Sequence, residues 1–142
     1  MAKRRPTLSC FIDSSVLFSA TNSPTGGSSK IFTKNLKLIV SIVVLTEVER
    51  NIRDKLTDYH LKRFFLLVSK ITILNQVPNQ RQIESAKKVI VEKDAVILAS
   101  AKLAKSQILL TLDQKHFLTP TVGEFMKPAQ ILTPKMFFER FP

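Results

Sequence analysis

The sequence predicts an α/β domain in which helices cover both faces of a parallel β-sheet. Short apolar runs that are typical of buried strands alternate with segments whose apolar residues recur at helical spacing. The links between them are short, and no internal repeat or domain linker interrupts the alternation. Such a pattern is typical of parallel strands joined by helices. With 142 residues, 44% of them hydrophobic, the chain is expected to form one domain over residues 1–142.

The first part of the chain is expected to contribute two strands and the helices that follow them. Ser, Thr and Asp residues stand where helices would need N-terminal caps, and Gly and Pro mark the loop. In chain order we expect a strand at Leu8–Ile12, a helix or turn at Ser14–Ala20, a loop at Thr21–Gly27, a short helix from Ser28 to Lys34 or Asn35, a strand at Leu38–Val40, and a helix from a Ser41 cap to about Lys55.

The second part is expected to complete a sheet of five strands. One helix would bury Leu61, Phe64, Phe65 and Val68. In chain order we expect that helix after a cap at Thr57 or Asp58, a strand at Ile71–Leu74, helices at Asn79–Val91 and Lys93–Lys105, strands at Ile108–Thr111 and Ala129–Leu132, and a last helix that starts at Thr133-Pro134.

The chain is strongly basic, with a formal net charge of +11. A charge of this size favours a polyanionic partner such as nucleic acid, although lysines also serve solubility alone. No apolar run approaches the roughly 20 residues that a membrane span requires. The basic segment Met1–Arg5 is not followed by a signal-peptide core. A cytoplasmic protein without a membrane partner is therefore expected, and its single cysteine, Cys10, is expected to be a buried thiol.

Four of the 11 acidic residues stand beside or inside apolar runs. Asp13 and Asp113 each directly follow a predicted strand, Glu47 lies in the second turn of a helix, and Asp94 begins another helix. An ionised carboxylate in an apolar setting is costly unless it is paired or binds a metal. The placement of these four residues therefore predicts a functional site.

The four carboxylates are expected to meet where ligands bind in open parallel sheets, beyond the carboxyl ends of the strands. Like charges gathered there would repel one another unless cations neutralise them. Oxygen ligands select hard cations such as Mg²⁺ or Mn²⁺. One cysteine and two histidines without ligand-like spacing disfavour zinc. Such ions catalyse in-line displacement at phosphodiesters.

Each acidic residue also has a simpler interpretation, since Asp caps helices and forms turns, and Glu is common on exposed helix faces. The alternatives left open are a cap at Asp13, an exposed Glu47 with Glu49 in its place, a cap at Asp94 with Glu92 as the ligand, and a turn at Asp113.

Four segments in order along the chain resemble the motifs of PIN-domain nucleases. They are Phe11–Leu17 (FIDSSVL), Leu45–Arg50 (LTEVER), Glu92–Ala101 (EKDAVILASA) and Leu110–Phe117 (LTLDQKHF), and the closing Ile131–Phe137 (ILTPKMF) is also similar to that family. The resemblance implies a three-layer α/β/α domain whose five-stranded parallel sheet has the order 3-2-1-4-5. It implies Mg²⁺- or Mn²⁺-dependent cleavage of RNA, with a catalytic and metal-binding site formed by Asp13, Glu47, Asp94 and Asp113.

The resemblance also assigns positions around the four acids. Ser15 and Thr111 match polar positions from which a hydroxyl can orient a ligating carboxylate, although a cap or strand packing would explain them equally well. His116 either lies near substrate phosphate or makes a structural hydrogen bond, and the second is expected. Many prokaryotic members are toxins, so a small antitoxin protein and a homodimer are candidate partners.

Two functions of different classes follow. The first is a metal-dependent endoribonuclease, and the alternative is a nucleic-acid-binding or regulatory module with little or no turnover. A phosphoacceptor domain is a weaker third interpretation, because it would carry an acidic pair where Ser14-Ser15 stand. Lys30, Lys34, Arg50, Arg53 and Lys93 are candidates for phosphate contacts.

Overall fold

The computed structural model describes residues 7–142, which form five strands and nine helices. The basic segment Met1–Arg5 lies outside these residues. The strands form one sheet in the order β3-β2-β1-β4-β5, and every neighbouring pair is parallel, which confirms the predicted fold. The strands are β1 (Ser9–Ile12), β2 (Lys37–Val40), β3 (Thr72–Ile73), β4 (Ile108–Leu110) and β5 (Gln130–Leu132).

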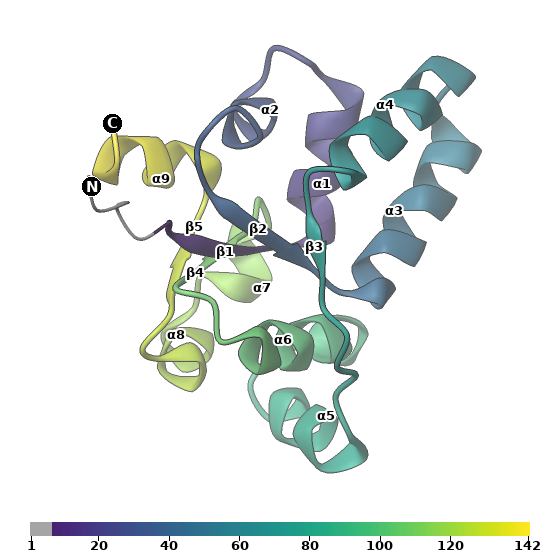
Figure 1. Cartoon of the computed structure of the whole chain (residues 1–142). Helices are drawn as coiled ribbons and strands as arrows, with labels where there is room; N and C mark the ends of the chain where they lie inside the picture. The colour runs from purple at the N-terminus through teal and green to yellow at the C-terminus, as the bar shows by residue number, and fades with distance from the viewer. Residues whose placement is uncertain (1–6) are drawn as a thin grey trace, which may run out of the picture.

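Helices form a layer on each side of the sheet (Figure 1). One layer contains α1 (Ser14–Asn22), α2 (Gly27–Ile31), α3 (Ile42–Lys55) and α4 (Asp58–Val68). The other contains α5 (Gln80–Lys87), α6 (Glu92–Ala104) and α8 (Pro120–Met126). The short helix α7 (Gln114–Phe117) follows β4, and α9 (Pro134–Arg140) packs on α2 and β5.

The core centres on β1 and β4, two of the three strands that have a partner on both sides. Phe11, Ile12, Leu109 and Leu110 are fully buried, because helices cover both faces of these strands. The edge strand β3 is exposed on both of its residues. The continuous apolar runs of β1 and β4 are thus those expected of central parallel strands.

Side chains that cap helices fix the points at which the chain leaves the sheet. The Ser41 side chain accepts a hydrogen bond from the Val44 N–H at 3.2 Å, and Thr133 accepts one from Met136 at 3.1 Å. Pro134 occupies the first turn of α9, where its missing N–H costs nothing. The predicted starts of α3 and α9 are therefore confirmed.

Four local expectations were wrong. Helix α1 continues through Asn22 and α2 begins at Gly27, so the expected loop at Thr21–Gly27 is shorter; the Thr21 hydroxyl is buried and donates to the Leu17 carbonyl at 2.8 Å. Phe65 is 51% exposed rather than buried, because Phe64 and Leu67 carry the buried stripe of α4. Helix α5 stops at Lys87 instead of reaching Val91.

The fourth concerns the segment between β4 and β5, in which no helix was predicted. Helices α7 and α8 occupy it. Their few residues carry little helical periodicity, and Pro120 and Gly123 are usual signs of a loop. The structure shows Pro120 in the first turn of α8, behind a Thr119 cap.

Candidate metal centre

The four predicted acids lie on elements that begin at the carboxyl edge of the sheet. Asp13 follows β1 directly, and its N–H donates to the Leu110 carbonyl at 3.0 Å, which extends the pairing with β4 by one residue. Asp113 lies just beyond β4 at the start of α7. Glu47 lies in the second turn of α3, and Asp94 in the first turn of α6.

The Asp13 carboxylate is almost completely buried, with 4% of the residue exposed. Its Oδ2 accepts hydrogen bonds from the hydroxyls of Ser15 and Thr111, both at 2.8 Å. Burial raises the pKa of Asp13, these two bonds offset part of the rise, and the charge of Glu47 adds to it. Its side chain makes no capping bond to α1, so the interpretation as only a helix cap is wrong.

The hydroxyls of Ser15 and Thr111 also hold the segment that carries Asp113. Ser15 Oγ accepts from the Leu112 N–H at 2.9 Å, and Thr111 Oγ1 accepts from the Asp113 N–H at 3.0 Å. Each hydroxyl therefore bonds the Asp13 carboxylate and the backbone that leads to Asp113. These contacts are those of residues that orient carboxylates; their part in metal binding stays a prediction.

Glu47 faces α1, and its rival Glu49 does not. Glu47 Oε2 accepts a hydrogen bond from Ser14 Oγ at 3.0 Å. Glu49 instead pairs with Arg53, one turn along the exposed side of α3, at 3.2 Å. Glu49 therefore does not share the contact that Glu47 makes with α1, and Glu47 stays the predicted site residue. Ser14 was not among the predicted site residues, because no pattern in the sequence distinguishes a serine that caps a helix from one whose hydroxyl bonds a glutamate on another helix.

Asp94 is directed into the protein, whereas Glu92 is not. The Asp94 side chain is 15% exposed, and that of Glu92 is 84% exposed and lies 3.5 Å from Lys87 Nζ. Glu92 is therefore not the ligand that one alternative proposed. Burial raises the pKa of Asp94; the adjacent charge of Lys93 lowers it, and Asp13 and Asp113 raise it further.

One oxygen of Asp94 lacks a hydrogen-bond partner. Asp94 Oδ2 is inaccessible to solvent, and residues 7–142 supply it with no donor. Leaving a buried acceptor unsatisfied costs about 1–3 kcal/mol, and more for a charged group. The atom therefore points to a missing partner of positive charge.

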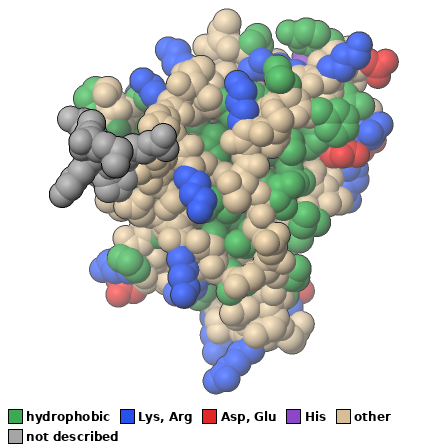
Figure 2. Space-filling view, viewed as in Figure 1, with side chains coloured by type: hydrophobic (Ala, Val, Ile, Leu, Met, Phe, Trp, Pro, Cys, Tyr) green, Lys and Arg blue, Asp and Glu red, His purple; other side chains and the backbone are tan. Residues whose placement is uncertain are grey.

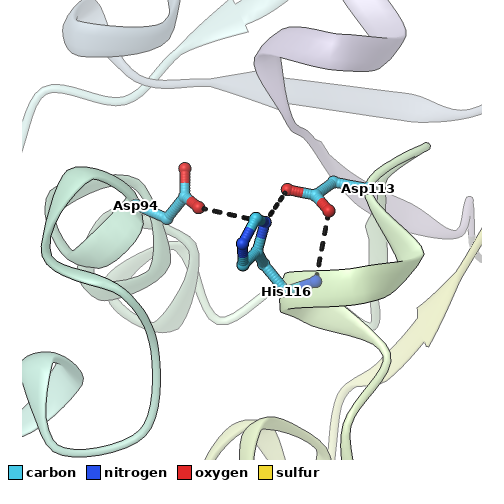
Figure 3. Close-up of side chains that lie close together, drawn as sticks. All are labelled: Asp94, Asp113 and His116. Carbon is cyan, nitrogen blue, oxygen red and sulfur yellow. Dashed lines mark hydrogen bonds and ion pairs between the residues drawn. The ribbon is translucent and has the colours of Figure 1, made fainter.

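Asp113 and His116 form a tight pair beside that oxygen (Figure 3). Asp113 Oδ1 accepts from the His116 backbone N–H at 3.1 Å, and Asp113 Oδ2 lies 2.8 Å from His116 Nδ1. His116 Nδ1 is also 3.9 Å from Asp94 Oδ2. Asp113 thus forms the predicted turn in addition to facing the site, and His116 makes the expected structural hydrogen bond.

Asp94, Asp113 and His116 together could hold a cation. Each offers one ligand atom, and these atoms lie within 4.8 Å of one another. Within the described part of the chain, Asp13 and Glu47 do not belong to this close group. Asp13 is linked to the group by its charge, which raises the pKa of Asp94, and by Thr111, which connects it to the Asp113 backbone. Glu47 acts by charge on Asp13. The orphaned Asp94 oxygen and the anionic donors fit a divalent cation.

Basic side chains are dispersed over the face seen in Figure 2 and do not form a single patch there. Among the predicted phosphate-binding residues, Arg53 pairs with Glu49, and Lys34 Nζ lies 5.6 Å from the Phe138 ring centre. Lys93 is the one that adjoins an acid of the site, Asp94. None of the described helices is both long and apolar enough to cross a membrane.

The chain is similar to one family of protein domains and to several solved structures. A model of the PIN domain family matches residues 10–119. The solved structure of PAE2754 from Pyrobaculum aerophilum is similar over 94% of each chain, with a TM-score of 0.63 and 15% identity. A toxin–antitoxin complex from Klebsiella pneumoniae matches 88% of this chain and 97% of the other, with a TM-score of 0.63 and 18% identity. Among curated proteins, none is significantly similar in sequence.

Proposed function

Because the chain belongs to the PIN domain family, we propose that it is a divalent-cation-dependent endoribonuclease. PIN domains are commonly nucleases, and many are toxins of toxin–antitoxin pairs. The observation that carries the proposal is the buried Asp94 Oδ2 beside Asp113 and His116, for which residues 7–142 supply no donor. Membership of a family of metal-dependent nucleases predicts a bound cation. A cation would also satisfy the buried Asp94 oxygen, which has no donor among the described residues.

The electrostatics of the site support this proposal. Burial raises the pKa of both Asp13 and Asp94, and the neighbouring acids add to the rise. A bound cation would reverse the effect of the neighbouring charges and favour the ionised carboxylates. The site is therefore costly without an ion and favourable with one.

Under this proposal Asp94 and Asp113 hold Mg²⁺ or Mn²⁺, with Asp13 and Glu47 completing the acidic, catalytic site. When bound, such an ion supplies an activated water and stabilises the leaving oxygen of a phosphodiester. The chain's own contribution is orientation. Ser15 and Thr111 fix the Asp13 carboxylate, and Ser14 fixes that of Glu47. Preformed contacts of this kind keep anionic ligands in place before substrate arrives.

The partners proposed are an RNA substrate, a small antitoxin protein and a second copy of the chain, in the cytoplasm. The net charge of +11 supports a polyanionic substrate. The similarity to a toxin–antitoxin complex supports the toxin role. A small open reading frame next to the gene would favour an antitoxin, and light scattering of the purified protein would give the mass that decides between monomer and dimer.

Cleavage of a labelled RNA in Mg²⁺ or Mn²⁺ tests the proposal. We expect cleavage by the wild type, its abolition by EDTA, and a large loss in Asp13→Asn and Asp94→Asn. Asp54→Asn is the matched control, because Asp54 lies exposed on α3. Equal cleavage by wild type and Asp94→Asn would refute the assigned site.

The alternative, a nucleic-acid-binding module without turnover, is motivated by the same positive charge. It predicts RNA binding that weakens with salt but is unaffected by EDTA, and no product after long incubation. Metal-dependent cleavage would exclude it. The same RNA and protein samples serve both tests, so one experiment separates the two functions.

A further inference from the structure

The imidazole of His116 lies between two carboxylates from different elements, Asp94 of α6 and Asp113 at the start of α7 (Figure 3). Its Nδ1 is 2.8 Å from Asp113 Oδ2 and 3.9 Å from Asp94 Oδ2. In an octahedral ion with ligands at about 2.1 Å, adjacent ligand atoms lie about 3 Å apart and opposite ones about 4.2 Å. The two distances from His116 Nδ1 are close to this range, and the ligand atoms of all three residues lie within 4.8 Å of one another.

The turn that begins α7 does not by itself require the imidazole. The turn that begins α7 is already closed by the His116 backbone N–H, which donates to Asp113 Oδ1 at 3.1 Å. The side chain is 24% exposed and so is mostly withdrawn from solvent. It leaves Asp94 Oδ2 without a hydrogen bond among the residues that the structure describes. An ion held by all three residues would satisfy that oxygen.

We propose that His116 is a nitrogen ligand of the cation, and that the site consequently prefers Mn²⁺ to Mg²⁺. The inference rests on the proposed function, of which it names the metal. In this arrangement Nδ1 directs its lone pair at the ion, and the neutral ring carries its proton on Nε2. With an ion bound, His116 and Asp113 would each hold it, and no proton would need to lie between Nδ1 and Asp113 Oδ2.

The selectivity follows from the chemistry of the nitrogen donor. Mg²⁺ binds through oxygen, keeps several waters and demands a near-ideal octahedron. Mn²⁺ also prefers oxygen ligands and is the weakest binder of the divalent transition-metal series, but as a transition-metal ion it accepts a nitrogen ligand beside carboxylates more readily than Mg²⁺ does. An all-carboxylate site would separate the two ions little, whereas one nitrogen ligand favours Mn²⁺.

Pulsed EPR of Mn²⁺ bound to the purified protein, without a histidine tag, tests the ligand directly. The chain has two histidines, His60 and His116, so few variants are needed. We expect an imidazole ¹⁴N coupling in the wild type and in His60→Gln, and its loss in His116→Gln. Wild-type Mn²⁺ without this coupling would overturn the proposal, and this result does not depend on how the variant folds.

Competition between the two ions tests the preference. We expect wild-type protein to bind Mn²⁺ at least 10-fold more tightly than Mg²⁺, and His116→Gln to lose most of that ratio while keeping its circular dichroism spectrum. An equal ratio in both proteins would overturn the proposal. If neither ion bound the wild type, the proposed nuclease would fail too; Mn²⁺-dependent RNA cleavage without nitrogen coupling would leave the nuclease standing and overturn only the His116 ligand.

Discussion

Replacing Thr111 with valine removes the hydroxyl that connects Asp13 to the Asp113 backbone and leaves the shape of the side chain unchanged. Thr111 is fully buried, and its Oγ1 donates to Asp13 Oδ2 at 2.8 Å and accepts from the Asp113 N–H at 3.0 Å. A hydrogen bond to a charged group contributes about 1.5–3 kcal/mol, and a neutral one about 0.5–1.5 kcal/mol. Because water cannot replace the buried hydroxyl, we expect Thr111→Val to lower the free energy of unfolding by about 2–4 kcal/mol.

Urea unfolding of Thr111→Val beside Thr33→Val measures this loss. Thr33 donates to the Lys30 carbonyl at 2.7 Å on the surface, so the same chemical change there is expected to cost under about 0.5 kcal/mol. In an Asp13→Asn background the penalty at Thr111 should shrink by about 1 kcal/mol, since the bond is then neutral. Metal affinity or RNA cleavage should fall by about 10–100-fold, as for other residues that orient metal ligands. A loss equal to that of Thr33→Val, or no coupling to Asp13, would show that the Thr111 hydroxyl does not bond an ionised Asp13 in the folded protein.

Three further outcomes follow from burial. Because the pKa of Asp94 is raised in the folded protein, protonated Asp94 favours the folded state. This stabilisation is complete below pH 3.8, the usual pKa of the group, and is lost as pH rises through the folded-state pKa. In EDTA, Asp94→Asn should therefore unfold at higher urea than wild type at pH 7.5, with the gap closing toward pH 4; a gap that widens on acidification would contradict this sign. Phe64→Ala should cost about 3–5 kcal/mol and Phe65→Ala under about 0.5 kcal/mol, and similar losses would contradict the exposure of Phe65. Burial raises the pKa of Cys10 to about 12, so the native thiol should resist a thiol reagent at pH 8 until urea exposes it; rapid native reaction would contradict its burial.

The sheet was predictable because buried parallel strands leave continuous apolar runs in the sequence. Central parallel strands are buried on both faces, so Leu8–Ile12 and Ile108–Thr111 read as apolar runs that no exposed segment would contain. The order of the strands came from the family resemblance and not from the pattern. The helices α7 and α8 escaped prediction, since so few residues show little periodicity and tertiary packing decides their fold.

The acids of the candidate site were recognisable by position, whereas their contacts were not. Asp13 and Asp113 follow strands, and the carboxyl ends of parallel strands lie at one edge. The choice between Glu47 and Glu49 depends on which side of α3 faces α1, and that depends on packing. The approach of His116 to Asp94 joins residues 22 positions apart on separate helices, a relation that no local spacing encodes.

A crystal grown with Mn²⁺ and measured at the manganese absorption edge tests the proposed metal site most directly. We expect an anomalous peak at the carboxyl edge of the sheet, within ligand distance of Asp94 and Asp113 and next to the His116 imidazole. Ordered side chains there without a peak, at Mn²⁺ concentrations that support RNA cleavage, would contradict the proposed site, as would a manganese ion bound only elsewhere on the protein.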